Sequence, residues 1–296
     1  MSAYPFRSEA AKARYLAHYD ERAKAWPVPS TTRLVEGAFG QTFVRSSGTE
    51  DAPPLLLLPG IGSPGLTFSQ NVADLSTRFR VHAVDNIHDH GRSMERAEHP
   101  VKDLADFVTW LDELCDGLGV GAQVNVAGLS FGGCLAGNYA LARPERVRRL
   151  VLLAPAGLLA PISWAFIWRA VLCLIPARVF MRNFMKWVSP ELREGGPHAA
   201  RLAEMADDGF LAQRCFASRR MVPPLPFSDE EWKRLTVPTL LLAGDREVIF
   251  PPEASFARVK TLVPSMELAL LPGAGHDFFV TRAPEVNRRV LEFLGG

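Results

Sequence analysis

The sequence lacks the cysteine patterns of a metal-binding or disulfide-rich protein. It has only 4 cysteines in 296 residues, and none of them forms a C-x-x-C pair. This spacing excludes a zinc knuckle and a disulfide-stapled scaffold. We therefore expect reduced thiols in the core at Cys115, Cys134, Cys173 and Cys215.

The sequence also lacks charge of one dominant sign. It has 33 Lys and Arg against 32 Asp and Glu, a net charge of +1, with no clustered basic run. A nucleic-acid partner is therefore not expected, because phosphates require a concentrated basic surface. Neither G-x-G-x-x-G after a strand nor G-x-x-x-x-G-K-[ST] occurs, so we expect no nucleotide cofactor, and no other cofactor is indicated.

Long hydrophobic runs are missing as well. The most apolar stretch, residues 158–175, is interrupted by Pro161 and Arg169 and is shorter than the ~20 apolar residues that span a bilayer. No transmembrane segment is predicted. A helical flap over a pocket is the favoured interpretation, and shallow membrane contact is a minor alternative. Residues 1–9 lack the apolar region of a secretory signal, so a cytoplasmic protein is expected.

Apolar residues make up 48% of the sequence, and their spacing indicates a regular series of helices and strands. An amphipathic helix is predicted over residues 8–26, followed by a hairpin of strands 31–36 and 41–45. Apolar strands then alternate with helical stretches, which is typical of parallel βα units. The predicted strands are residues 55–58, 80–85, 123–127, 150–153, 239–243 and 267–271, and the predicted helices are 68–79, 101–118, 132–142, 251–263 and 284–294.

The alternation is broken once, where aromatic residues and proline are dense and no strand is indicated. We interpret residues 155–235 as a helical lid inserted into an α/β core. The core then consists of residues 1–154 and 236–296, with a mostly parallel central sheet flanked by helices. The sequence does not indicate an oligomeric state.

Residues 123–133 read QVNVAGLSFGG, an apolar strand that runs into G-x-S-x-G and then into a small-residue helix. This is the context of a nucleophile elbow, with Ser130 as the nucleophile. Ser130 is expected at a strained, positive-φ position. The turn can close only if the residues two before and two after it lack a Cβ, and Gly128 and Gly132 meet this requirement. A turn that merely packs a helix on a strand is the alternative for the pentapeptide alone.

Two further elements follow in the order acid, then histidine. His276 ends the segment LPGAGH after the last predicted strand, and the segment AGDREV after the preceding strand offers Asp245 and Glu247. A serine hydroxyl is a weak nucleophile that needs a histidine base, and a carboxylate orients that base. His276 is therefore the candidate base, with either carboxylate as its partner.

With these motifs the chain resembles the α/β-hydrolases, specifically the lidded carboxylesterase-like serine hydrolases. LLPGIG at residues 57–62 is similar to the family's HGxG loop, although Pro59 stands where the family usually has His. The turn DNIHDHGRS at residues 85–93 is similar to the family's D-x-x-G-x-G-x-S. The resemblance implies the backbone N–H groups of Ile61 and Phe131 as oxyanion donors, and it favours Glu247 over Asp245 because the acid usually stands three residues after Gly244.

The resemblance implies a serine hydrolase that cleaves a small to medium, mainly apolar carboxylic ester through an acyl-enzyme. The same triad serves carbon–carbon bond hydrolases, lactonases, perhydrolases and acyltransferases, so these remain alternatives. A non-catalytic receptor for a small ligand is a further alternative. Ser130 argues against the dehalogenases and epoxide hydrolases of this fold, which use a carboxylate nucleophile.

Two other groups of side chains invite interpretation. Aromatic residues of the lid are predicted to line the substrate pocket, although aromatics at helical spacing are usually core; they are Trp164, Trp168, Phe184 and Trp187. The run His88-Asp89-His90 contains residue types that bind metal ions. However, H-x-H without a third histidine nearby is only weak evidence for a metal site. No metal site is predicted.

Overall fold

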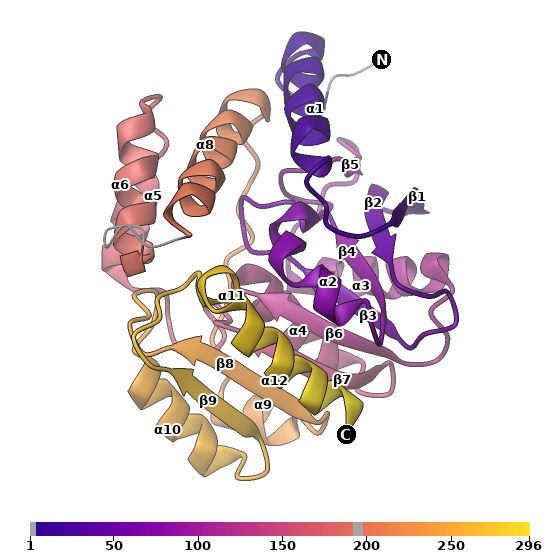
Figure 1. Cartoon of the computed structure of the whole chain (residues 1–296), viewed down its shortest axis with the longest axis vertical. Coiled ribbons are helices and arrows are strands. Elements are labelled where there is room, and N and C mark those ends of the chain that lie inside the picture. Colours follow the sequence, from indigo (N-terminus) through magenta and orange to yellow (C-terminus); the bar gives the residue numbers. More distant parts are fainter. Residues whose placement is uncertain (1–3, 192–197) are drawn as a thin grey trace.

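The computed structural model describes residues 4–191 and 198–296. Within these ranges a single nine-stranded sheet forms the centre of the molecule (Figure 1). Its strands are β1 (Ser30–Gly37), β2 (Gly40–Ser47), β3 (Pro54–Leu58), β4 (Arg80–Val84), β5 (Met94–Glu95), β6 (Val124–Leu129), β7 (Val147–Leu153), β8 (Thr239–Gly244) and β9 (Glu267–Leu271).

Helices cover both faces of the sheet. In Figure 1, α12 crosses in front of the strands, while α3 and α4 lie behind them. The helices of the described residues are α1 (Glu9–Ala23), the 3-10 helix η1 (Gly65–Gln70), α2 (Val72–Leu75), α3 (Leu104–Leu118), α4 (Phe131–Ala142), α5 (Trp164–Leu172), α6 (Arg178–Val188), α8 (Ala199–Cys215), α9 (Asp229–Arg234), α10 (Pro252–Leu262), α11 (Phe278–Thr281) and α12 (Ala283–Gly295).

The strand order is β1-β2-β4-β3-β6-β7-β8-β9, with the short β5 paired to β2. The hairpin β1–β2 and the pair β2–β4 are antiparallel. All pairs from β4 to β9 are parallel. The predicted α/β fold with a mostly parallel sheet is therefore confirmed. Parallel strands place their carboxyl ends at one edge, so the loops after β3, β6, β8 and β9 meet there.

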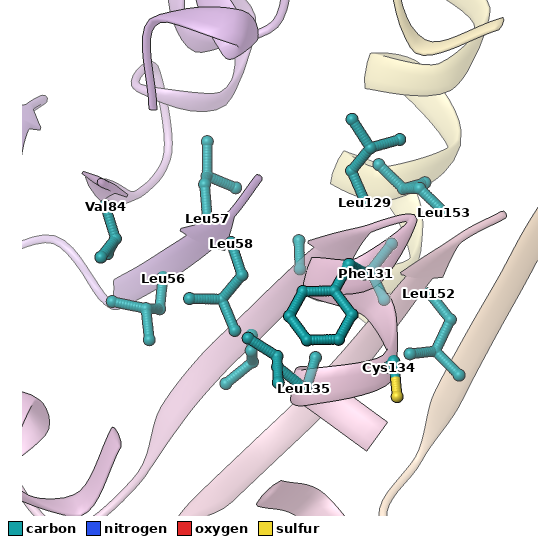
Figure 2. Packing of buried hydrophobic residues seen from close by; sticks show 14 of the residues in the cluster. Leu56, Leu57, Leu58, Val84, Leu129, Phe131, Cys134, Leu135, Leu152 and Leu153 are labelled. Atoms are coloured by element: carbon teal, nitrogen blue, oxygen red, sulfur yellow. The ribbon is translucent and has the colours of Figure 1, made fainter. Parts of the chain in front are cut away.

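The core explains why the parallel strands read as apolar runs. Leu55 to Leu58 of β3 are all at most 1% exposed, because helices cover the strand on both faces. Figure 2 shows Leu56, Leu57 and Leu58 beside Phe131 and Leu135 at the start of α4. Each fully buried leucine stabilises the fold by roughly 1.5–3 kcal/mol. The elbow at Ser130 therefore stands on a densely packed base.

One predicted helix is wrong. Residues 68–79 do not form one helix but a 3-10 helix, η1, and a short α2, with a break at Asn71. The buried side chain of Asn71 donates from Nδ2 to the carbonyl oxygen of Phe279 (3.0 Å) and to Oδ1 of Asn287 (2.8 Å). These bonds join the segment to α11 and α12, so tertiary contacts override the local helical pattern.

Between β7 and β8 the described residues form helices and loops but no strand of the sheet. Helices α5, α6 and α8 stand together beyond one end of the sheet, and α1 lies beside α8 (Figure 1). Hydrogen bonds join α1 to α8: Oδ1 of Asp208 on α8 accepts from Nε2 of His18 (2.7 Å) and from Nε of Arg22 (3.0 Å). The four cysteines are buried and free. Within the described ranges, no helix has the length and apolar character needed to cross a membrane.

Candidate active site

Ser130 occupies a sharp turn between β6 and α4. Its backbone angles are φ 52° and ψ −118°, a conformation that costs free energy unless the surroundings hold it. The N–H of Ser130 donates to the carbonyl of Leu153 (2.8 Å), and its carbonyl accepts from Ala156 (3.1 Å) and Cys134 (3.1 Å). Its side chain does not cap α4. The buried hydroxyl is thus not used by the helix that it precedes.

The glycines on either side of Ser130 are required by close backbone packing. A Cβ on Gly128 would lie 2.2 Å from the carbonyl oxygen of Gly132, and a Cβ on Gly132 would lie 2.2 Å from that of Leu58. A Cβ on Gly60 would come within 3.2 Å of the Ser130 Cβ. The elbow therefore closes only with glycine at positions 128 and 132, as the sequence predicts. The loop that contains Gly60 lies against Ser130.

His276 lies in the loop after β9 and is paired with a carboxylate from the loop after β8. Its Nδ1–H donates to Oε2 of Glu247 at 2.6 Å. The other oxygen of Glu247, Oε1, accepts from the N–H groups of Val248 and Ile249, both at 2.8 Å. The Glu247 side chain is 0% exposed. This arrangement keeps the proton on Nδ1 and leaves Nε2 available as a base.

The environment of His276 favours its protonated form. Burial by itself lowers the pKa of His276, but the charge and the hydrogen bond of Glu247, together with the charge of Asp277, raise the pKa above its ordinary value of 6.5. A base with a raised pKa accepts a proton more readily during reaction. The site is therefore suited to transient formation of an imidazolium.

Asp245, the other candidate acid, does not contact the imidazole. It is exposed, and its Oδ1 accepts from the N–H of Gly273 at 2.7 Å. Asp245 therefore joins the loop after β8 to the loop after β9, while Glu247 alone of the two bonds to His276. The hydroxyl of Ser130 forms no hydrogen bond with His276 or with any other group of residues 4–191 and 198–296.

The glycine loop after β3 is braced by two aspartates. Ser63 donates to the carbonyl of Gly60 (3.2 Å) and closes a turn, and the N–H of Gly62 donates to Oδ2 of Asp89 (2.7 Å). The N–H of Gly65 donates to Oδ1 of Asp85 (2.7 Å). These carboxylates hold a loop whose Pro59 cannot offer the side-chain bonds of a histidine. This role was not predicted from the sequence, although both aspartates lie in the turn DNIHDHGRS at residues 85–93.

The two N–H groups predicted as oxyanion donors are not engaged in hydrogen bonds within the described residues. In the part of the chain that the structure describes, the N–H groups of Ile61 and Phe131 donate to no protein acceptor. Phe131 is the first residue of α4, where backbone N–H groups lack intrahelical partners and favour negative charge. Asp85, which accepts from the N–H of Gly65 in the glycine loop, is a buried carboxyl. Burial raises the pKa of Asp85 to about 6, against the lowering effect of hydrogen bonds from Arg92, Gly65 and Tyr19.

His88 and His90, in the turn at residues 85–93, both contact other groups of the protein. His88 contacts Oε1 of Glu95 through Nδ1 (2.5 Å) and the carbonyl of Arg220 through Nε2 (2.8 Å). The ring of His90 packs on Phe216 with a centroid distance of 4.8 Å. Among the described residues, no group of three or more His, Cys, Asp or Glu is placed to hold a metal ion.

The segment between β7 and β8, which is predicted to be a lid and is called the lid below, is attached to both loops that carry Glu247 and His276. At its start, Ser163 donates from its backbone to Ile249 (2.7 Å) and from its hydroxyl to Val248 (2.8 Å). At the end of α6, the carbonyl of Val188 accepts from the N–H of His276 (3.4 Å), and the Ser189 hydroxyl donates to Asp277. The position of the lid and the geometry of the Glu247–His276 pair are therefore coupled.

The predicted pocket aromatics occupy different environments. Trp164 and Trp168 are 81% and 50% exposed, so they face solvent. The partly buried Trp187 stacks on the guanidinium of Arg169 (4.3 Å), and Phe184 packs on Phe166 (5.2 Å). None of the four lines the cavity of about 60 Å³ between α1, the loop after Gly62 and α8. For Phe184 and Trp187, a pocket-lining role stays a prediction.

The fold and the turn at Ser130 are consistent with the family that the sequence matches. Residues 55–289 match the model of the alpha/beta hydrolase family. The chain belongs to this family, as its sequence motifs predict. The match spans the elbow, the loop after β8 and the loop after β9, so Ser130, Glu247 and His276 all lie inside it.

Individual carboxylesterases are similar to this chain over nearly its whole length. The chain is 33% identical to carboxylesterase YbfK of Bacillus subtilis over 96% of this chain and 94% of the relative. The structure is similar to naproxen esterase (carboxylesterase NP) from Bacillus subtilis, with TM-score 0.87, 31% identity and coverage of 96% and 98%. It is also similar to carboxylesterase CesB (YbfK) of that organism, with TM-score 0.86, 30% identity and coverage of 97% and 99%.

Proposed function

We propose that this protein is a serine carboxylesterase that hydrolyses small to medium, mainly apolar esters. The observation that carries the proposal is the buried pair Glu247–His276, with a 2.6 Å hydrogen bond at Nδ1, at the sheet edge that also presents Ser130. Similarity to carboxylesterases over nearly the whole chain supports the same reaction. No cofactor is required by this chemistry.

In the proposed mechanism, Ser130 Oγ attacks the ester carbonyl while His276 Nε2 takes its proton. The tetrahedral oxyanion is held by the N–H groups of Ile61 and Phe131. Collapse breaks the bond to the alkoxide, which leaves as the alcohol with the proton from His276. Water, deprotonated by His276, then attacks the acyl-enzyme and releases the acid and Ser130. Glu247 holds the imidazole and stabilises its charged form.

The proposal is tested with a series of p-nitrophenyl esters from acetate to longer acyl chains. Ser130→Ala is expected to lower kcat by several orders of magnitude, as removal of a triad nucleophile does. Ser76→Ala is a matched control, because the Ser76 hydroxyl is exposed and only donates to Ala73. Ester hydrolysis that survives in Ser130→Ala would refute the assignment of the nucleophile. The chain-length optimum measures the size of the acyl pocket.

We infer a cytosolic location from the cysteines. All four are buried and free, which is usual for a protein kept in a reducing compartment.

A further inference from the structure

Helix α5 presents its apolar face outward. Eight of its nine residues, WAFIWRAVL, are apolar, yet none of them is buried. Trp164, Ile167, Trp168 and Val171 are all exposed and follow the spacing i, i+3, i+4, i+7 that places side chains on one face of a helix. In a globular protein such a face normally points into the core. Here it forms a continuous stripe on the surface.

The stripe continues past the end of α5 into the start of α6. It consists of Trp164, Ile167, Trp168, Val171, Leu174, Ile175 and Val179. We call these residues the apolar stripe. They are seven of the eleven exposed large hydrophobic side chains in the described part of the chain. Exposed apolar residues gathered in this way mark an interaction surface.

The opposite side of the α5–α6 hairpin is well packed. Phe166 of α5 contacts Phe184 of α6 with a ring distance of 5.2 Å. Cys173, Met181 and Ala206 form a small buried cluster that joins the hairpin to α8. The apolar stripe is therefore not the result of a detached helix, because the hairpin already buries its inner face.

The charged residues of the α5–α6 hairpin itself are all positive. Residues 161–190 contain no Asp or Glu but four cations, Arg169, Arg178, Arg182 and Lys186. The last three recur every four residues along one side of α6 and are exposed. Arg178 and Arg182 share the single carboxylate of Asp207 on α8. The surface of the hairpin thus combines apolar side chains with a net positive charge.

We propose that the α5–α6 hairpin docks on a lipid surface that carries anionic headgroups. The apolar stripe enters the boundary between headgroups and acyl chains, and the α6 cations contact the lipid phosphates. Trp164 and Trp168 suit this boundary, because the indole ring is apolar with one polar N–H. A second copy of the chain fits this surface poorly, since pairing two hairpins would bring their cations together.

Docking at this surface places lipid beside the candidate active site. Both ends of the hairpin are bonded to the loops that carry Glu247 and His276, through Ser163 and Val188. A hydrophobic ester dissolved in the lipid would then reach the site without crossing bulk water. The docking itself does not depend on ester hydrolysis, so the two proposals are tested separately.

The test measures binding of the full chain, and of its Ser130→Ala variant, to phosphatidylcholine vesicles with and without phosphatidylglycerol. Cosedimentation gives the partition coefficient. We expect binding to the anionic vesicles that weakens at high salt, with a blue shift of tryptophan emission. Trp164→Ser/Leu174→Ser is expected to lower the partition coefficient about tenfold or more. Leu34→Ser/Leu225→Ser is the matched control, because these leucines are exposed outside the hairpin.

A second pair of substitutions tests the electrostatic part. Arg178→Gln/Lys186→Gln is expected to weaken binding to anionic vesicles by about fivefold for each charge removed, with no effect on neutral ones. Failure of the wild-type chain to bind anionic vesicles would overturn the proposal, as would equal loss of binding in the leucine control. A concentration-dependent dimer that disappears in Trp164→Ser/Leu174→Ser, without vesicle binding, would assign the stripe to a second copy instead.

Discussion

The hydroxyl of Ser189, at the end of α6, donates a hydrogen bond to the carboxylate of Asp277, the neighbour of His276. Both side chains are buried. The lid thereby contacts the histidine loop through a charge-assisted bond. Burial raises the pKa of Asp277 above its ordinary range, against the lowering effects of His276 and of the Ser189 hydrogen bond.

Removal of this bond is expected to disturb both stability and catalysis. Ser189→Ala leaves a buried carboxylate without its donor, which costs about 1–3 kcal/mol of the free energy of unfolding. We expect kcat to fall several-fold as the His276 loop loses its support. Chemical denaturation and ester hydrolysis measure the two effects. If both are unchanged, the contact between lid and loop has no energetic weight.

The pH dependence of ester hydrolysis follows from the raised pKa of His276. The base acts only when neutral, so kcat/KM should rise with pH through the raised pKa and be lost on acidification, with its midpoint above 6.5. In Glu247→Gln the negative charge is gone, so the midpoint should move to lower pH. A titration of kcat/KM from about pH 5 to 9 checks this. An unchanged midpoint in the variant would contradict the pairing.

The two acidic residues of the loop after β8 should differ sharply in their effect on rate. Glu247→Gln is expected to lower kcat by about 10² to 10⁴, because the imidazole loses its charged partner. Asp245→Asn should keep kcat within about tenfold, since an amide oxygen can still accept from Gly273. Comparable losses in the two variants would show that Asp245 takes part directly.

The steric role of Gly132 predicts a large loss of stability on substitution. In Gly132→Ala the new Cβ would meet the carbonyl oxygen of Leu58 at 2.2 Å, so the elbow must shift at a cost of about 3 kcal/mol or more. Gly209→Ala in α8 is the control, because its Cβ meets nothing closer than 3.7 Å and should stabilise the helix by about 0.5–1 kcal/mol. Thermal and urea unfolding of both variants compare these outcomes.

Asp89 should matter for rate through the glycine loop that it braces. Asp89→Ala removes the acceptor of the Gly62 N–H, so the neighbouring N–H of Ile61 is held less firmly and kcat should fall about tenfold or more, with a smaller change in KM. Asp89→Asn keeps one acceptor oxygen and should recover part of the activity. Full activity in Asp89→Ala would show that the loop keeps its shape without this bond.

Much of the fold could be predicted because the patterns are local. The apolar runs at residues 239–243 and 267–271 became β8 (Thr239–Gly244) and β9 (Glu267–Leu271), since a buried strand needs apolar side chains along its whole length. The two-residue β5 and the four-residue α11 were missed. Such short elements show no periodicity, and neighbouring chain segments stabilise them.

The sequence by itself determined the class of fold, the elbow at Ser130 and the histidine at 276, because strand alternation and G-x-S-x-G depend on residues within a few positions. The sequence offered both Asp245 and Glu247, with Glu247 favoured by the family resemblance, and the tertiary structure decided which of them pairs with His276. The register between β8 and β9 sets Gly244 beside Leu271, and from there the loops bring Glu247, not Asp245, to the imidazole. Likewise, Asp89 supports the glycine loop after β3, in which Pro59 stands where the family usually has histidine. In the same way, α5 exposes its apolar face. Each of these facts depends on contacts between segments far apart in the chain, which no local pattern encodes.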